Sequence, residues 1–458
     1  MRRLLLLGAA ILLTGSGFLW LMGRTERINV LLITLDTRRL EDLGVYGGPA
    51  ETPHLQALRD DGTLFHHMYS VAYGTTPSHA SLFTSSHARR HGVYNNRTIL
   101  PDEFDTLAEV MASHGAQTAA FVSSMAVRRE LGFDQGFAGF NQAFGGGQRR
   151  GGQTVKHFVA WLRGVDGRFF AWIHLMEPHT PYMPTLSLGR RYLPDDGEFH
   201  RKGSYYRFNK ELRPRGLLRQ GRAVFSEYNR LARGLYRGEI SLMDRQIGKA
   251  INALMERGLY DRTLIVVVAD HGENFADPDP LLAFGHGALH QHVVRLPLVI
   301  KMPDSRGAGS SYNFLAASID IAPTVLDALG FEPMASWTGN SMLPAIRSHR
   351  AIFRDHVVLE SAHEREVSVR TDRWVYRRMI GRPHPRHPHL SPLQFYDLAT
   401  DPGEARNTCS QLSPEGRVAF EHLDRIARQF LAEKDEATSE MLETQPHLEA
   451  LKALGYIQ

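Results

Sequence analysis

"INVLLITLD", residues 28–36, is the stretch that decides the fold, because its apolar residues run almost unbroken to the carboxylate of Asp36. A strand buried on both faces has this pattern, since helices cover both sides of a parallel sheet. "TLIVVVADHGE", residues 263–273, repeats the pattern and places Asp270 and His271 at the end of its apolar run. The two stretches predict central strands of one sheet.

Helix-like and strand-like segments alternate around these two runs. Strands are expected at residues 117–124 and 168–175, and helices at residues 52–62, 105–115 and 154–164 and along a long stretch from Leu231 to Leu254. This alternation predicts an α/β fold with a large, mostly parallel sheet flanked by helices. Shorter strand-like pieces and a last helix at residues 414–432 predict a small C-terminal α+β subdomain. We expect a catalytic domain over residues 28–345, and this subdomain with a helical tail over residues 350–458.

Two stretches interrupt the alternation. "FGGGQRRGGQ", residues 144–153, is rich in glycine and is expected to be a flexible loop. The segment at residues 190–222 is polar and rich in arginine, which favours a solvated insertion over a rim that recognises anions.

The N-terminus predicts a membrane anchor over residues 1–23. Arg2 and Arg3 precede an apolar run at residues 4–22, which has about the length of a bilayer-spanning helix. We expect the catalytic domain to lie outside the cytoplasm, on the periplasmic or extracellular side, and the protein to be secreted if the segment is a cleaved signal peptide. The single Cys409 excludes an intrachain disulfide and a cysteine metal cage.

The overall charge gives no reason to expect a nucleic-acid partner. Lysine and arginine total 53 against 49 aspartates and glutamates, so the net charge is only +4. Anionic small molecules remain open as ligands.

Polar side chains at the strand ends predict a divalent-cation site. Ligands of open α/β sheets bind beyond the carboxyl ends of the strands, where Asp36, Asp270 and His271 are expected. Carboxylate oxygens and an imidazole nitrogen are natural ligands for such a cation. A carboxylate at one strand end also caps a following helix, so Asp36 alone does not decide between the two roles.

"GTTPSHASLFTSS", residues 74–86, predicts a helix start that carries a reactive hydroxyl. Pro77 suits the first helical position, which makes Thr76 the expected N-cap and leaves Thr75 without a structural duty. Thr75 then lies at a positive helix terminus that attracts anions. Beside a metal ion its hydroxyl can attack phosphorus or sulfur, although such a sequence is also an ordinary cap.

A series of motifs resembles the sulfatase family of the alkaline phosphatase superfamily. They occur in the family's order between residues 29 and 407: "NVLLITLDT", "TPHLQALRDDGTLF", "TTPSHASLFTSSHARRHGV", "MEPHTPY", "YRGEISLMDRQIGKAINAL", "TLIVVVADHGE", "FGHGALHQHVVRLPLVI" and "FYDLATDPGEARN".

The resemblance implies roles for seven residues. It makes Asp36, Asp270 and His271 metal ligands and Thr75 the nucleophile that also contacts the metal. His179 and His286 match positions that hold the substrate anion or assist the leaving group, and His79 stands where the family has an arginine.

The nucleophile position departs from the family pattern. Sulfatases carry a cysteine or serine that is converted to formylglycine, whereas this chain has Thr75, so conversion is not expected. Thr37 replaces the second aspartate of the usual pair. Fewer carboxylates and an added imidazole favour manganese or zinc over calcium. A second metal held by Glu177, His179 and His286 stays open.

These observations favour a membrane-anchored, metal-dependent hydrolase or transferase that uses Thr75 to cleave phosphate-type esters. Its substrate is expected to be an anionic ester, either small or linked to a lipid or glycan. Two alternatives remain, a sulfatase acting at the same site and a catalytically degenerate binding protein.

Overall fold

The computed structural model describes residues 28–144, 148–193, 202–212, 214–361, 366–380, 389–433, 440–442 and 448–449. The membrane anchor predicted over residues 1–23 lies outside these residues. Among the helices that the structure describes, none combines the length and apolar character needed to cross a bilayer.

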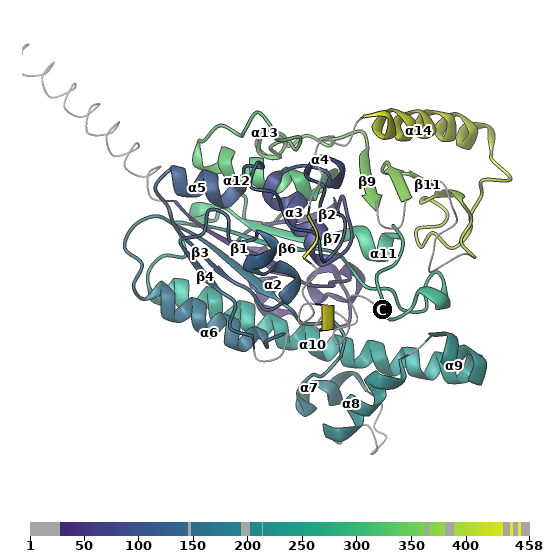
Figure 1. Cartoon of the computed structure of the whole chain (residues 1–458), viewed down its shortest axis with the longest axis horizontal. Helices are drawn as coiled ribbons and strands as arrows, with labels where there is room; N and C mark the ends of the chain where they lie inside the picture. The colour runs from purple at the N-terminus through teal and green to yellow at the C-terminus, as the bar shows by residue number, and fades with distance from the viewer. Residues whose placement is uncertain are drawn as a thin grey trace, which may run out of the picture.

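A large sheet forms the centre of the molecule (Figure 1). Its strands are β1 (Asn29–Leu35), β2 (Thr63–Tyr69), β3 (Gln117–Phe121), β4 (Gly139–Asn141), β5 (Phe169–Leu175), β6 (Thr263–Ala269), β7 (Arg295–Lys301) and β8 (Ser310–Ala317). The order across the sheet is β4-β3-β5-β1-β6-β7-β2-β8. β1 pairs in parallel with β5 and β6, and among the described strands of this sheet only β7 runs antiparallel to its neighbours. The predicted α/β sheet, large and mostly parallel, is confirmed.

Helices cover both faces of this sheet (Figure 1). One layer contains α6 (Gly151–Leu162) and the long α10 (Arg222–Glu256), which also packs against α2 (Pro53–Asp60). The other layer contains α3 (Thr75–Thr84), α5 (Leu107–Ser113) and α12 (Ile321–Leu329). The shorter helices are α4 (Ala88–His91), α7 (Leu186–Tyr192), α8 (Lys202–Glu211), α9 (Pro214–Gln220), α11 (Gln291–Val294) and α13 (Leu343–Arg347).

The arginine-rich segment at residues 190–222 is more ordered than its composition indicates. It carries α8 and α9, and α9 packs against α10. Tyr205 and Phe208 are buried, so apolar side chains anchor this segment to the body of the protein. The segment is therefore not solvated throughout, because buried aromatic side chains lie among its charged ones.

A second, antiparallel sheet forms the C-terminal part. Its order is β12-β11-β10-β9, with β9 (Val357–Ser361), β10 (Glu366–Arg370), β11 (Trp374–Met379) and β12 (Leu393–Asp397). The amphipathic α14 (Pro414–Ala432) lays Leu423 and Ala427 on this sheet, while Val418 on its outer side is 70% exposed. The expected small α+β unit is therefore present, and the exact boundaries at residues 345 and 350 stay a prediction.

Buried polar contacts stabilise the second sheet and join it to the loop that precedes β7. Arg370 pairs with Glu404, and Arg377 lies 3.5 Å from the same carboxylate, all three side chains being buried. The Leu289 amide donates to Glu366 on β10 at 3.0 Å. The Leu289 contact holds the loop after residue 286 against the C-terminal sheet, and the ion pairs of Glu404 stabilise that sheet itself.

Candidate metal centre

The pairing of β1 with β6 brings the predicted carboxylates together. Leu35 lies opposite Ala269, so Asp36 and Asp270 leave neighbouring parallel strands at the same edge of the sheet. The Asp270 amide donates to the Leu35 carbonyl at 3.2 Å, which fixes this register at the strand ends. Asp36, Asp270 and His271 each offer one ligand atom, and these atoms lie within 4.8 Å of one another.

Electrostatics distinguish the two carboxylates. Burial raises the pKa of Asp36, but the charges of His179, His174 and His271 outweigh it and hold that pKa below its usual value. Burial, and then the charge of Asp36, hold the pKa of Asp270 well above its usual value. Two acids this close repel each other when both are ionised, and a cation between them removes that repulsion.

The donor atoms of this trio fit a divalent cation. Asp270 Oδ1 already accepts from the amides of Thr37 at 3.1 Å and His271 at 2.6 Å. Asp270 Oδ2 and His271 Nε2 are buried and have no hydrogen-bond partner among the described residues. Buried donors and acceptors of this kind are costly unless a ligand engages them.

Thr75 opens α3, two residues earlier than the sequence predicts. Gly74 is the N-cap, with a φ of 93° that favours glycine, and both Thr75 and Thr76 are helical. Thr76 therefore caps nothing: its hydroxyl donates to the Ala126 carbonyl at 2.6 Å and its amide donates to Asn96 at 2.9 Å. The predicted N-cap is wrong because Pro77 tolerates any position of the first turn, where amides lack helical partners.

The Thr75 hydroxyl lies in the first turn of this helix. Its Oγ1 is buried and makes no hydrogen bond within the part of the chain that the structure describes. The Thr75 carbonyl accepts from His79 Nδ1 at 2.7 Å, and the same nitrogen lies 3.8 Å from Asp270 Oδ2. The predicted nucleophile therefore adjoins the predicted metal ligands.

His79 lies behind Thr75, in a chain of hydrogen bonds. Because its Nδ1 faces a carbonyl, the neutral ring carries its proton there, so Nε2 accepts from the Thr34 hydroxyl at 2.9 Å. Trp172 Nε1 donates to the same hydroxyl at 2.9 Å. Burial lowers the pKa of His79 to about 3, which keeps the ring neutral. This placement favours a role in positioning Thr75 over direct contact with substrate.

His179 and His286 extend the site toward the surface. The His286 ring lies 4.4 Å from that of His271 and 5.9 Å from that of His179, measured between centroids. His179 is buried and His286 is half-buried. The two imidazoles therefore lie on the more open side of the metal-ligand group, where a substrate anion would enter.

Glu177 has a structural partner at the start of α6, and it belongs to neither of the candidate metal-binding groups among the described residues. Both of its carboxylate oxygens accept from the Gly151 amide, at 2.9 and 3.1 Å, at the start of α6. The glycine-rich loop expected to extend to residue 153 thus ends earlier, because Glu177 stabilises the helix terminus there. The structure does not support a second cation held by Glu177, His179 and His286.

His174 is a site residue that the sequence reasoning missed. It lies in β5 opposite Thr34, is fully buried, and its Nε2 is 3.7 Å from Asp36 Oδ2. Neither ring nitrogen has a hydrogen-bond partner among the described residues. The sequence did contain a sign of this role, because His174 is a lone titratable residue near the end of the apolar run at residues 168–175. We interpreted that run only as a strand.

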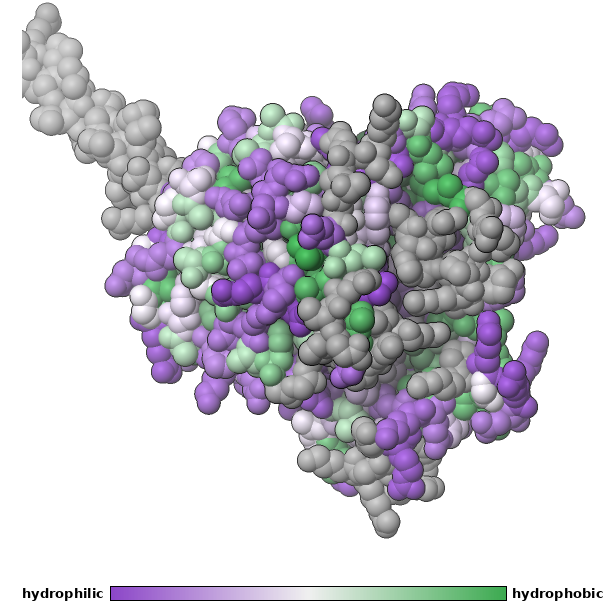
Figure 2. Space-filling model, viewed as in Figure 1, coloured by the Kyte–Doolittle hydropathy of each residue, from purple (hydrophilic) through white to green (hydrophobic). Residues whose placement is uncertain are grey.

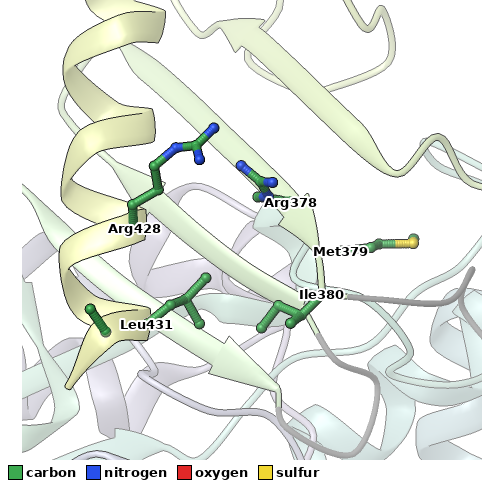
Figure 3. Close-up of a pocket in the computed structure, with 6 residues that line it drawn as sticks. Arg378, Met379, Ile380, Arg428 and Leu431 are labelled. Atoms are coloured by element: carbon green, nitrogen blue, oxygen red, sulfur yellow. The ribbon is translucent and has the colours of Figure 1, made fainter. Parts of the chain in front are cut away.

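A separate surface cavity lies away from this centre, between β11 and α14. It measures about 340 Å³ and is lined by Arg378, Met379, Ile380, Arg428, Leu431 and Ala432. Figure 3 shows the side chains of Arg378 and Arg428 extending toward each other from the strand and the helix. Asp424 pairs with both arginines, at 3.1 and 2.7 Å. The surrounding surface mixes hydrophilic and apolar residues (Figure 2), and none of the predicted site residues lines this cavity.

A mostly parallel sheet with candidate acidic and imidazole ligands at its carboxyl edge, beside a helix that begins with a hydroxyl residue, is the arrangement expected of an α/β metal-dependent hydrolase. The chain belongs to the sulfatase family, because the Sulfatase family model matches residues 28–331. The model "N-sulphoglucosamine sulphohydrolase, C-terminal" matches residues 283–419. The protein is therefore an enzyme, a sulfatase-family hydrolase.

Relatives and solved structures agree with this assignment. Arylsulfatase A from Bos taurus is 26% identical over 90% of this chain and 90% of its own length. A protein solved in complex with its substrate D-glucosamine-2-N,6-O-disulfate matches with a TM-score of 0.74 at 18% identity, over 90% of this chain and 99% of that one. The phosphonate monoester hydrolase of Agrobacterium radiobacter matches with a TM-score of 0.70 at 22% identity, over 88% and 96%.

Proposed function

We propose that this enzyme cleaves phosphate-type esters through a covalent adduct on Thr75. The observation that carries the proposal is the Thr75 hydroxyl, which is buried without a hydrogen-bond partner in the described chain. The carbonyl of the same residue accepts from the His79 ring, which lies 3.8 Å from Asp270 Oδ2. A hydroxyl in that position serves no packing or capping purpose. It is a weak nucleophile until it loses its proton to a base or to solvent, which a bound metal ion favours by lowering its pKa.

The proposed reaction has two steps. The Thr75 oxygen forms a bond to phosphorus while the bond to the ester oxygen breaks, and that oxygen leaves with a proton from His179 or His286. Water or an acceptor alcohol then attacks phosphorus, and the Thr75 oxygen departs and regains its proton. A cation held by Asp36, Asp270, His271 and Thr75 would supply positive charge that lowers the pKa of the hydroxyl and stabilises the attacked group.

The residue type explains why a phosphoryl group suits this site. A formylglycine hydrate has a second hydroxyl with which it expels sulfate, but Thr75 has a methyl group at that position and needs an external nucleophile. Phosphoryl adducts are cleared by that route. The structural likeness to a phosphonate monoester hydrolase supports this choice.

The donor set supports manganese or zinc. His271 contributes nitrogen, and Thr37 stands where a further carboxylate would favour calcium. We infer a small, glycan-linked or lipid-linked anionic ester as substrate. From the N-terminal sequence we further infer a membrane anchor with the site outside the cytoplasm.

Sulfate-ester hydrolysis is the second candidate. It is favoured by the similarity to arylsulfatase A and to the protein solved with a sulfated glucosamine. In that case the same cation and the same histidines would bind a sulfate group.

The test is a substrate panel on the purified full-length chain. Aryl phosphate, phosphodiester, phosphonate and sulfate esters are each assayed with Mn²⁺, Zn²⁺ or Ca²⁺. We expect turnover of phosphate-type esters, its loss in Thr75→Ala, and its retention in Thr84→Ala, whose buried hydroxyl bonds only to the Ala80 carbonyl in the same helix. Turnover of sulfate esters alone would favour the second candidate. Full activity in Thr75→Ala would overturn the mechanism, and no turnover would favour a binding protein.

A further inference from the structure

The deepest part of the site contains a second group of ligand atoms. His79, His174 and Asp270 each offer one atom, and these three atoms lie within 4.8 Å of one another. Ligand atoms of a tetrahedral zinc ion lie about 3.3–3.6 Å apart, because each lies about 2.0–2.2 Å from the metal. Side-chain shifts of up to about 1 Å would close the group around an ion.

The environment of His174 is independent evidence that this group binds a cation. The ring is fully buried, and neither nitrogen finds a hydrogen-bond partner in the described chain. Its Nε2 faces Asp36 Oδ2 at 3.7 Å, too long for a hydrogen bond, and its ring lies 5.1 Å from that of His79 between centroids. A buried imidazole without partners is costly, and a coordinated cation accounts for it.

The surroundings of His79 suit a metal-bound imidazole. Its Nδ1 lies 2.7 Å from the Thr75 carbonyl and 3.8 Å from Asp270 Oδ2, so a cation bound there would replace the proton that Nδ1 donates to that carbonyl. Its Nε2 lies 2.9 Å from the Thr34 hydroxyl. When Nδ1 binds a cation, the ring proton moves to Nε2, and the Thr34 oxygen can accept it there. Metal-bound histidines usually donate their second ring N–H to a neighbour in this way.

Asp270 connects the two groups. Two amide donors occupy its Oδ1, so Oδ2 is the oxygen that faces both His271 at 3.5 Å and His79 at 3.8 Å. One carboxylate oxygen shared by two cations would place the second ion on the inner side, away from His286. This location differs from the second site that the sequence left open at Glu177, His179 and His286.

We propose that His79, His174 and Asp270 bind a second, inner cation of the zinc type, bridged to the outer one through Asp270. Two imidazoles and one carboxylate are donors that zinc accepts and that calcium does not favour. The positive charge of the inner ion would keep the Asp270 carboxyl ionised. This ion would not contact substrate. The proposal does not depend on which ester the enzyme cleaves.

Zinc stoichiometry tests the proposal without any activity assay. The full chain is stripped of metal, loaded with Zn²⁺ and dialysed, and bound zinc is counted by elemental mass spectrometry. We expect two zinc ions in the wild type, one in His174→Gln, one in Asp36→Asn and none in the double variant. His91→Gln, which alters an equally buried histidine outside both groups, should keep two. One zinc in the wild type, or an unchanged count in His174→Gln, would overturn the inner site.

A crystallographic measurement covers the case in which the variants fail to fold. Anomalous difference maps at the zinc edge, from wild-type crystals grown with Zn²⁺, should show two peaks, one of them among His79, His174 and Asp270. A single peak at Asp36 and His271 would refute the proposal. An inactive enzyme with two zinc ions would leave the inner site standing and count only against the proposed ester chemistry.

Discussion

Replacing Thr34 by valine should loosen the chain of hydrogen bonds that positions the predicted nucleophile. The two side chains have nearly the same shape, so the change removes a hydroxyl and little else. It leaves Trp172 Nε1 and His79 Nε2 without their shared partner, and both side chains are fully buried. An unsatisfied buried group costs about 1–3 kcal/mol, so two of them should lower the free energy of unfolding by about 2–6 kcal/mol.

The matched control is Thr84→Val. Thr84 is equally buried, but its hydroxyl bonds only to the Ala80 carbonyl of its own helix, so about 1 kcal/mol or less should be lost. Urea unfolding measures both variants, and steady-state kinetics should show a lower kcat with a similar KM for Thr34→Val, because a freed His79 ring no longer fixes Thr75. Equal stability and equal kcat in the two variants would refute the reasoning.

Three further predictions concern stability and metal. Burial, and then the charge of His87, lower the pKa of His91 to about 3. Below about pH 6.5 the unfolded state therefore takes up a proton at this residue and the folded state does not, so the free energy of unfolding falls as the pH falls. The loss between about pH 8 and about pH 5, measured by urea unfolding, should be about 2 kcal/mol smaller in His91→Gln, and an unchanged loss would contradict this. Gly151→Ala should lower the melting temperature, because the added Cβ would lie 2.6 Å from Glu177 Oε2. Gly152→Ala should not lower it, because its Cβ would lie 3.3 Å from the nearest atom, in Gln246. Chelation should abolish ester cleavage, and Mn²⁺ or Zn²⁺ should restore it better than Ca²⁺; better rescue by Ca²⁺ would argue against the assigned donor set.

The sequence predicted the parts of the fold that depend on local pattern. The apolar runs at residues 28–36 and 263–273 became β1 and β6, because a strand buried on both faces needs a continuous apolar sequence. Their parallel pairing then placed Asp36 and Asp270 at one edge, which is a general property of such sheets.

The features that could not be predicted from the sequence depend on contacts between distant segments. Glu177 starts α6 by accepting from Gly151, and Asn96 holds the Thr76 amide, so the starts of α6 and α3 lie three and two residues earlier than predicted. No local pattern contains either contact. His174 was missed for the same reason: it belongs to the site only because β5 lies beside β1.

The central claim is that Thr75 forms the covalent bond, and trapping that bond tests it most directly. The full-length enzyme is mixed with an activated aryl phosphate, phosphodiester or phosphonate ester, quenched in acid within the first turnover and analysed by peptide mass spectrometry. The account predicts a phosphoryl or phosphonyl group on Thr75 that disappears as turnover is completed. Turnover of these esters with Thr75 unmodified at every time, or with the adduct on another side chain, would contradict it.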